Sequence, residues 1–154
     1  MSLNLISTHV LGLALVSCLL TGCGGGSDAP DRYTLEGSIV FDGQPIPAGT
    51  ITLIPDSGKG NSGPAGSARI KDGKFTTAEA GTGVVGGSHI IRVKAFDGNP
   101  KPDEELPLGS PLFPEYEFQY DLPEYDGTSP VSVDLKVPKS AKNPKPKGSR
   151  RQEV

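Results

Sequence analysis

The chain has 154 residues, of which 34% are hydrophobic, and its formal net charge is −3. One domain at most is expected from this length, and a charge so close to neutral indicates neither a nucleic-acid platform nor a polyanion. The two cysteines, Cys18 and Cys23, both lie near the N-terminus, which excludes a disulfide framework or a cysteine-based zinc site in the rest of the chain.

An apolar run from Val10 to Leu20 leads into the tetrapeptide Leu20-Thr21-Gly22-Cys23. The run has the length of a signal-peptide core and falls short of the roughly 20 residues that span a bilayer. The tetrapeptide resembles the lipobox of bacterial lipoproteins, with leucine three positions before the cysteine and two small residues between them. The resemblance implies that a lipoprotein signal peptide, residues 1–22, is cut between Gly22 and Cys23 during export.

Cys23 is the lipidation site that this resemblance implies. Its sulfur would receive a diacylglyceryl group and its new amino group a fatty acyl chain such as palmitate; two or three such chains hold a protein stably on a membrane. The glycine-rich residues 23–32 would then form a flexible, lipidated tether. The first nine residues contain no Lys or Arg, unlike most signal peptides. An ordinary signal peptide cut nearby and an uncleaved apolar anchor are the alternatives.

Beyond the tether, apolar and polar residues alternate in short segments that predict β-strands. In the first of these, Gly37 lies on the same face as the apolar residues and marks a point of close approach. The Asp-Gly pairs at 42–43, 72–73 and 126–127 predict tight turns, because type I′ turns need positive φ. The predicted strands are Tyr33–Phe41, Thr50–Ile54, Ser67–Lys71, Lys74–Thr77, Ser88–Phe96, a segment over 116–120, and Val131–Val137.

About seven short strands separated by turn residues predict an all-β fold, a β-sandwich over residues 33–137 that is close in size to an immunoglobulin-like domain. Residues 138–154 are rich in Lys and Pro and nearly free of apolar side chains, so they predict a disordered basic tail. The positive charge of this tail suits contact with anionic lipid head groups, a cell-wall polymer or an acidic partner. A frayed end that only aids solubility is the simpler interpretation.

Three segments, Gly37–Pro55, Ile70–Phe75 and Gly86–Val93, together resemble a known family. They are similar to the carboxypeptidase regulatory-like domains, which are transthyretin-like β-sandwiches, as found in planctomycete-type small lipoproteins. The resemblance covers about Leu35 to Val137, and Gly86-Gly87 stands where the family often has Pro-Gly. Its motifs are turns and strand ends, so it implies the fold more than the function, and domains of this family are generally non-catalytic.

The sequence holds no motif that indicates catalysis. His89 is the only histidine after Cys23, and the nucleophile motif Gly-x-Ser-x-Gly is absent. The glycine clusters match neither phosphate-binding loop pattern, and a lone histidine supplies too few ligands for a transition metal. We therefore expect a non-enzymatic protein whose only attached group is the lipid on Cys23.

An acidic, proline-rich segment over residues 97–126 is the remaining candidate site. Clustered carboxylates on loops can bind Ca²⁺, although no EF-hand spacing is present, and the weak candidates are Asp121, Glu124 and Asp126. The tyrosines at 116, 120 and 125 could stack on a carbohydrate, but alternating tyrosines in a strand more often pack in the core. A solvated acidic face is the simplest interpretation.

These features together predict an exported, membrane-anchored lipoprotein on the periplasmic or outer-membrane face of the cell envelope. Its sandwich would serve as an interaction or structural module, with the membrane bound through the lipid and an envelope protein or polymer as partner. No nucleic-acid role is expected. The alternative is a lipoprotein that binds carbohydrate or Ca²⁺ through the acidic 97–126 segment.

Overall fold

Strands dominate the computed structural model, which describes residues 31–143. The predicted signal peptide, Gly22, Cys23 and most of the tether lie outside the described residues, as does the tail beyond Asn143. No helix within 31–143 is long and apolar enough to cross a membrane. The strands are β1 (Leu35–Phe41), β2 (Gln44–Pro45), β3 (Ala48–Pro55), β4 (Gly66–Lys71), β5 (Lys74–Thr76), β6 (Gly87–Phe96), β7 (Tyr116–Leu122) and β8 (Val131–Val137), joined by the 3-10 turns η2 (Ser57–Lys59), η3 (Pro102–Glu104) and η4 (Lys139–Lys142).

The all-β prediction is confirmed, and the seven predicted strands occur with bounds that differ by at most two residues. The strands form one sheet in the order β2-β1-β5-β4-β3-β6-β7, and every pair along this order is antiparallel. In addition, β8 pairs with β1 in parallel along the whole of both strands. Because β8 occupies one edge of β1, the short strands β2 and β5 share its other edge.

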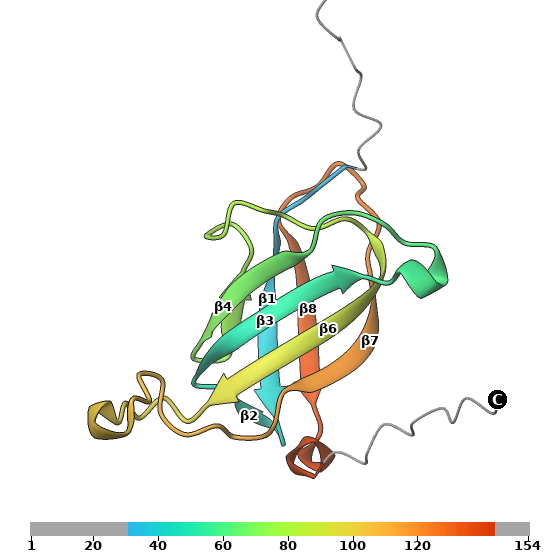
Figure 1. Ribbon diagram of the computed structural model, residues 1–154. Helices are drawn as coiled ribbons and strands as arrows, with labels where there is room; N and C mark the ends of the chain where they lie inside the picture. Colours follow the sequence, from blue (N-terminus) through green and yellow to red (C-terminus); the bar gives the residue numbers. More distant parts are fainter. Residues whose placement is uncertain (1–30, 144–154) are drawn as a thin grey trace, which may run out of the picture.

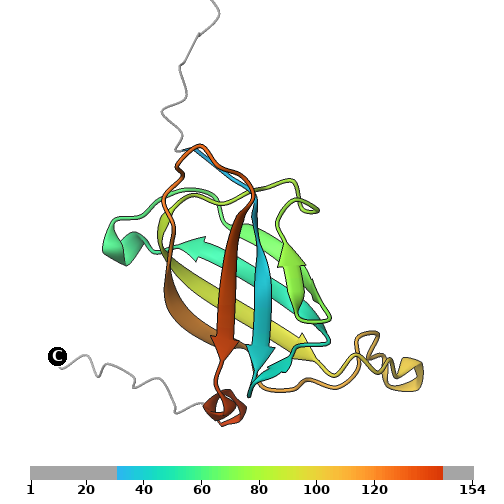
Figure 2. The same ribbon diagram turned by 180° about the vertical axis from the view of Figure 1, so that it is seen from behind.

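The sheet curls so that its two ends face each other. One layer contains β3, β6 and β7, and β1 and β8 form the other layer behind it, with the β4–β5 hairpin at one side (Figure 1). The opposite view shows the same arrangement with β8 and β1 in front (Figure 2). The apolar core fills the space between these layers as one cluster, to which β1, β3, β4, β5, β6, β7 and β8 all contribute.

The predicted alternation of faces is confirmed by burial. Leu35, Ile39 and Phe41 of β1 are buried, as is Tyr33 just before the strand. Gly37 lies between them at the predicted close approach, since a Cβ on this residue would overlap the carbonyl oxygen of Val133 on β8. Glycine at this position therefore lets β1 and β8 pair closely on one side while β5 pairs on the other.

Two of the three predicted Asp-Gly turns join paired strands. Asp42 and Gly43 connect β1 to β2, and Asp72 and Gly73 connect β4 to β5; all four residues have positive φ, as a type I′ turn requires. Gly127 also has positive φ, but it lies within the longer loop between β7 and β8.

The predicted boundary of the folded part at Val137 is too early. Residues 138–143 continue as η4, and Ala141 within it is fully buried in the core. Lys139 Nζ lies 3.3 Å from Asp42 Oδ2, and Lys142 Nζ lies 5.6 Å from the centre of the Phe41 ring. Composition favoured disorder here because a single apolar residue supplies too weak a pattern to be recognised in sequence.

Candidate functional site

A groove of about 1110 Å³ lies on the outer surface of the sheet. It crosses β8, β1, β5, β4 and β3, and we call it the outer groove. It takes outward-facing residues from each strand, since they alternate with the buried ones: Glu36, Ser38, Thr50, Arg69, Lys71, Lys74, Thr76, Ser132 and Asp134.

The pairing of β4 and β5 explains why the sheet is hollowed at this place. These strands pair only through Ile70–Phe75 and Lys71–Lys74, and the rest of β4 pairs with β3 alone. The sheet is therefore interrupted between the hairpin arms, and the buried side chains of Ile70 and Phe75 reach the lining of the groove from the core.

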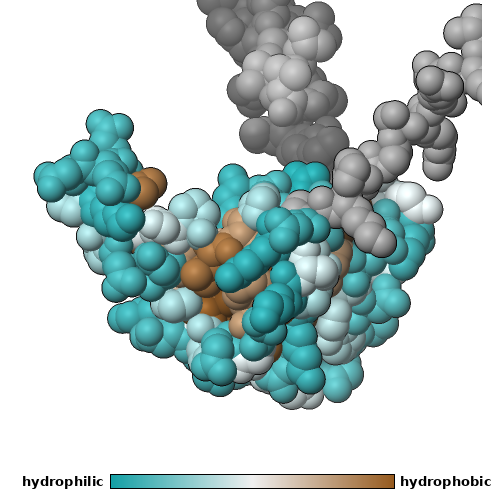
Figure 3. All heavy atoms as spheres, turned by 90° about the horizontal axis from the view of Figure 1, so that it is seen from below, coloured by the Kyte–Doolittle hydropathy of each residue, from teal (hydrophilic) through white to brown (hydrophobic). Residues whose placement is uncertain are grey.

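A loop over residues 97–114 projects from the lower end of the domain (Figure 1). Its Leu108 is 40% exposed and lines the groove. Seen from below, hydrophobic atoms gather in a recess between hydrophilic surroundings, next to the lobe that this loop forms (Figure 3). The loop belongs to the acidic segment of the predicted ligand-binding alternative, and it is held by the Lys101–Leu106 and Phe96–Pro111 bridges and by the buried Phe113.

Charges of both signs surround the outer groove. Arg69, Lys71 and Lys74 stand on β4 and β5, together with the acidic Asp72 in the turn between these strands and Glu79 after β5. Glu36 and Asp134 stand on β1 and β8, and all seven charged residues are exposed. Five ion pairs occur among residues 31–143, and none of them involves a charged residue of this groove.

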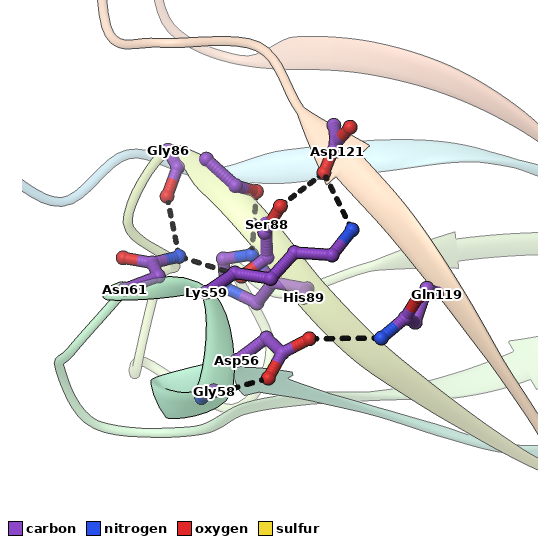
Figure 4. Close-up of polar contacts among 10 residues, drawn as sticks. Asp56, Gly58, Lys59, Asn61, Gly86, Ser88, His89, Gln119 and Asp121 are labelled. Atoms are coloured by element: carbon purple, nitrogen blue, oxygen red, sulfur yellow. Dashed lines mark hydrogen bonds and ion pairs between the residues drawn. The ribbon is translucent and has the colours of Figure 1, made fainter.

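A second cluster of polar groups lies where β3 ends and β6 begins (Figure 4). The carboxylate of Asp56, which is buried, accepts hydrogen bonds from the Gly58 backbone at 3.0 Å and from Gln119 Nε2 at 3.0 Å. Asn61 Nδ2 donates to the carbonyl oxygens of Gly86 and Ser88 at 2.9 and 2.7 Å. These bonds satisfy the polar groups and fasten the loop after β3 to β6 and β7, which is a structural role.

Ser88 and His89 are adjacent in this cluster but point to opposite faces of β6, as successive residues of a strand must. The Ser88 hydroxyl donates to Asp121 Oδ1 on the outside, whereas His89 is buried and its Nδ1 lies 2.9 Å from the Gly87 carbonyl oxygen. His89 Nε2 is buried without a hydrogen-bond partner among the described residues. The geometry therefore does not assemble a serine–histidine pair at these positions.

The three weak candidate Ca²⁺ ligands, Asp121, Glu124 and Asp126, each contact a different part of the protein. Asp121 accepts from Ser88 and lies 4.0 Å from Lys59 Nζ. Asp126 accepts a hydrogen bond from the Thr128 backbone at 2.9 Å, and this bond is the main reason that the pKa of Asp126 lies below its usual value. Glu124 packs against Gly86. Across residues 31–143, no three His, Cys, Asp or Glu side chains are grouped to hold a metal ion.

The three tyrosines that were candidates for stacking on a carbohydrate make different contacts within the protein. Tyr116 and Tyr120 are partly buried on the inner face of β7 and pack against the core. Tyr125 instead stacks on Tyr33, with ring centres 5.7 Å apart. They do not form one exposed platform.

Sequence reasoning missed the outer groove and the Asp56 cluster. Asp56 followed by Ser57-Gly58 is a local signal for a capped turn, and it could have been recognised. The groove has no such signal, because its residues come from five strands whose pairing is not visible in the sequence.

A scan of protein-family models and a search of curated proteins found no match to this chain. The proposed function therefore rests on the sequence of this chain and the geometry of its structure.

Proposed function

We propose that this chain is an exported lipoprotein, held on a membrane by lipid on Cys23, whose β-sandwich is a non-catalytic binding module of the cell envelope. The observation that carries the anchor is the tetrapeptide Leu20-Thr21-Gly22-Cys23 at the end of a signal-length apolar run. The strand content and the curled sheet support a transthyretin-like, carboxypeptidase regulatory-like sandwich as the finer description of the fold.

The position of the first described residues suits this anchor. The ten residues from Cys23 to Arg32 span at most about 35 Å when fully extended. The segment that leads into β1 lies at the upper end of the domain in Figure 1, and η4 and the 97–114 loop lie at the lower end. An anchor at Cys23 would therefore hold the upper end toward the membrane and present the lower end away from it.

The role as a binding module is supported by the outer groove. Ligand sites are concave, largely apolar and supplied with a few polar groups, and this groove has that character. The polar cluster around Asp56 has its hydrogen-bonding groups mostly satisfied by the protein itself, which favours structure over chemistry there.

Intact mass spectrometry of the membrane-extracted protein tests the proposal. We expect a mass that begins at Cys23 and includes a diacylglyceryl group and an acyl chain. Cys23→Ala should stay uncut and without lipid, while the matched control Cys18→Ala should be processed like the unmodified chain. If Cys23→Ala were cut and membrane-bound as before, the lipid anchor would be disproved.

A further inference from the structure

We propose that residues 144–154 of this chain, which we call the terminal segment, dock on the open edge of β7 and run parallel to it as an added strand. The segment is basic, since it carries Lys145, Lys147, Arg150 and Arg151. The proposed contact depends neither on the lipid anchor nor on a ligand for the outer groove. Its effect is to cover an edge that would otherwise offer its backbone groups to a strand of another chain.

The open edge of β7 is the edge that no strand among residues 31–143 covers. β7 is the last strand in the sheet order, and it pairs only with β6. The Ser88 carbonyl oxygen accepts from the Asp56 N–H at the end of β3, so the next residue, His89, turns its backbone groups toward β7. His89 lies opposite Tyr120, which therefore turns its own groups toward β6. The residues that alternate with Tyr120 turn theirs toward the open edge: Glu117, Gln119 and Asp121.

The inner face of β7 is less covered than that of its neighbour. Tyr116, Phe118 and Tyr120 are only partly buried, whereas the inward-facing Ile91 and Val93 of β6 are fully buried. A strand added at the open edge would extend the sheet past these three rings and cover more of their surface. The removal of apolar surface from water therefore favours an occupant at this edge.

The outward side chains along β7 are acidic. Glu115, Glu117 and Asp121 are exposed, and no Lys or Arg occurs between residues 102 and 135. A second copy of the chain that paired through the same edge would place these carboxylates beside one another, and like charges in a cross-strand pair are unfavourable. Charge therefore favours a basic strand over a second copy as the occupant.

The basic residues of the terminal segment have the spacing of the acidic residues on β7. Glu117 and Asp121 are four residues apart, and so are Lys147 and Arg151. Because side chains of a strand alternate between faces, a parallel register with Lys147 beside Glu117 also places Arg151 beside Asp121. The same register places Lys145 next to the acidic residue that precedes β7. Both prolines of the segment come before Lys147, so neither interrupts the strand that begins there.

The terminal segment begins near the start of β7. Lys142, at the end of η4, lies over the ring of Phe41, and the rings of Phe41 and Phe113 have centres 4.7 Å apart. The Phe113 ring in turn lies 6.5 Å from that of Tyr116, the first residue of β7. In Figures 1 and 2, η4 lies at the lower end of the domain, from which β7 runs upward. A segment that leaves η4 and follows β7 therefore runs parallel to it.

The length of the terminal segment is sufficient for this contact. The seven residues of β7 extend over about 23 Å. The eleven residues from 144 to 154 span at most about 40 Å when fully extended. The segment can therefore cross the short distance from η4 and still cover the whole of β7.

The acidic side chains of β7 already meet cations that lie on the other side of the strand. Glu117 Oε2 is 2.9 Å from Arg92 Nε, and Asp121 Oδ1 is 4.0 Å from Lys59 Nζ. A carboxylate accepts several hydrogen bonds, so a further cation at the open edge can bind without displacing these. Exposed ion pairs are weak and ordering the segment costs conformational entropy, so the segment separates on heating before the domain unfolds. Docking is therefore measured at ambient temperature and not by melting.

Amide hydrogen exchange, read by NMR on the full protein in non-ionic detergent, tests the proposal against a chain that ends at Asn143. We expect the amides of Gln119 and Asp121 to exchange about tenfold more slowly in the full protein and to lose this protection in high salt. The amides of Phe118 and Tyr120, which turn toward β6, should exchange equally in both chains. Equal exchange of Gln119 and Asp121 in the two chains would overturn the proposal.

Charge reversal tests the register. Lys147→Glu/Arg151→Glu in the terminal segment should remove the protection of the Gln119 amide, and so should Glu117→Lys/Asp121→Lys on β7. The protein that carries all four substitutions should regain the protection, because each pair again joins opposite charges. Loss of protection in both double variants without recovery in the combined one would contradict the paired register.

The remaining outcomes separate this contact from other occupants and from the lipid anchor. The control Glu36→Lys/Glu79→Lys reverses two exposed acidic residues outside β7 and should leave the protection unchanged, as should Cys23→Ala. Protection that rises with protein concentration would place the segment on a second copy and contradict the intramolecular contact. Binding of the segment to phosphatidylserine vesicles while Gln119 stays unprotected would assign it to a lipid surface and disprove the docking.

Discussion

Tyr33, just before β1, contacts segments that are distant from it in the sequence. Its backbone N–H and carbonyl pair with Val84 at 2.9 Å each, and its hydroxyl donates to the Pro123 carbonyl at 2.6 Å. Its ring stacks on Tyr125. The backbone of this residue thus joins the start of β1 to the loop before β6, and its side chain joins it to the loop after β7.

Tyr33→Phe should lower the free energy of unfolding by about 1 kcal/mol, because the Pro123 carbonyl loses its partner while the ring contacts remain. Urea denaturation of both proteins measures the difference. Tyr125→Phe is the matched control, since it removes a hydroxyl from the same ring stack at an exposed position and should cost much less.

The same hydroxyl makes the fold sensitive to alkaline pH. Burial, with a contribution from the Glu124 carboxylate, raises the pKa of Tyr33 to about 12 from the ordinary value of 10.0. Because the folded state holds this proton more tightly than the unfolded chain, the stabilisation is complete below pH 10 and is lost as the pH rises toward 12. Melting temperatures across this range should fall more steeply for the unmodified protein than for Tyr33→Phe; parallel curves would contradict the assignment.

At the scale of elements, η4 is a short segment with a clear structural role. It places Ala141 in the core, and its two lysines contact Asp42 and Phe41 at the end of β1 and in the turn that follows. It therefore covers the lower end of the layer that β1 and β8 form.

Truncation separates this role from that of the rest of the tail. Removing all residues after Val137 should cost about 1 to 2 kcal/mol, from lost apolar burial at Ala141 and the exposed cation–π contact of Lys142. Removing only the residues after Asn143 should leave thermal unfolding unchanged. Equal melting temperatures of the two truncated proteins would show that η4 contributes nothing to stability.

At the scale of the whole molecule, one apolar cluster joins both layers. It takes buried residues from seven strands, from η4 and from the loops that carry Val84 and Phe113. β1 is central to this arrangement, because it pairs with β5 on one side and with β8 on the other. Two layers that share one core are expected to unfold together.

Gly37→Ala tests this cooperativity. The added methyl group would overlap the Val133 carbonyl and press on Phe75, so we expect a loss of about 3 kcal/mol, at the upper end of overpacking effects. Calorimetry should show one transition at a lower temperature, with the calorimetric and van't Hoff enthalpies in agreement. Two separate transitions would mean that the layers unfold independently. Ser132→Ala, at an exposed site on β8, is the control and should melt like the unmodified protein.

The sequence by itself determined where strands lie and which residues face inward. The alternation in Val131–Val137 and in Ser88–Phe96 depends only on the two-residue period of a strand, and the Asp-Gly turns depend only on local backbone preference. Gly37 could be identified as a close approach because it interrupts an apolar face. The tetrapeptide Leu20-Thr21-Gly22-Cys23, which resembles a lipobox, is likewise a local motif, and it lies outside the described residues.

Only the tertiary structure decided which strands pair and what lies between them. The parallel pairing of β1 with β8 joins segments at opposite ends of the domain, and nothing in either strand specifies its partner. That pairing, with the early divergence of β4 from β5, brings Glu36, Asp134 and the basic residues of the hairpin around one groove. Contacts between distant segments depend on the packing of both partners together, so neither the groove nor the burial of Ala141 could be read from local pattern.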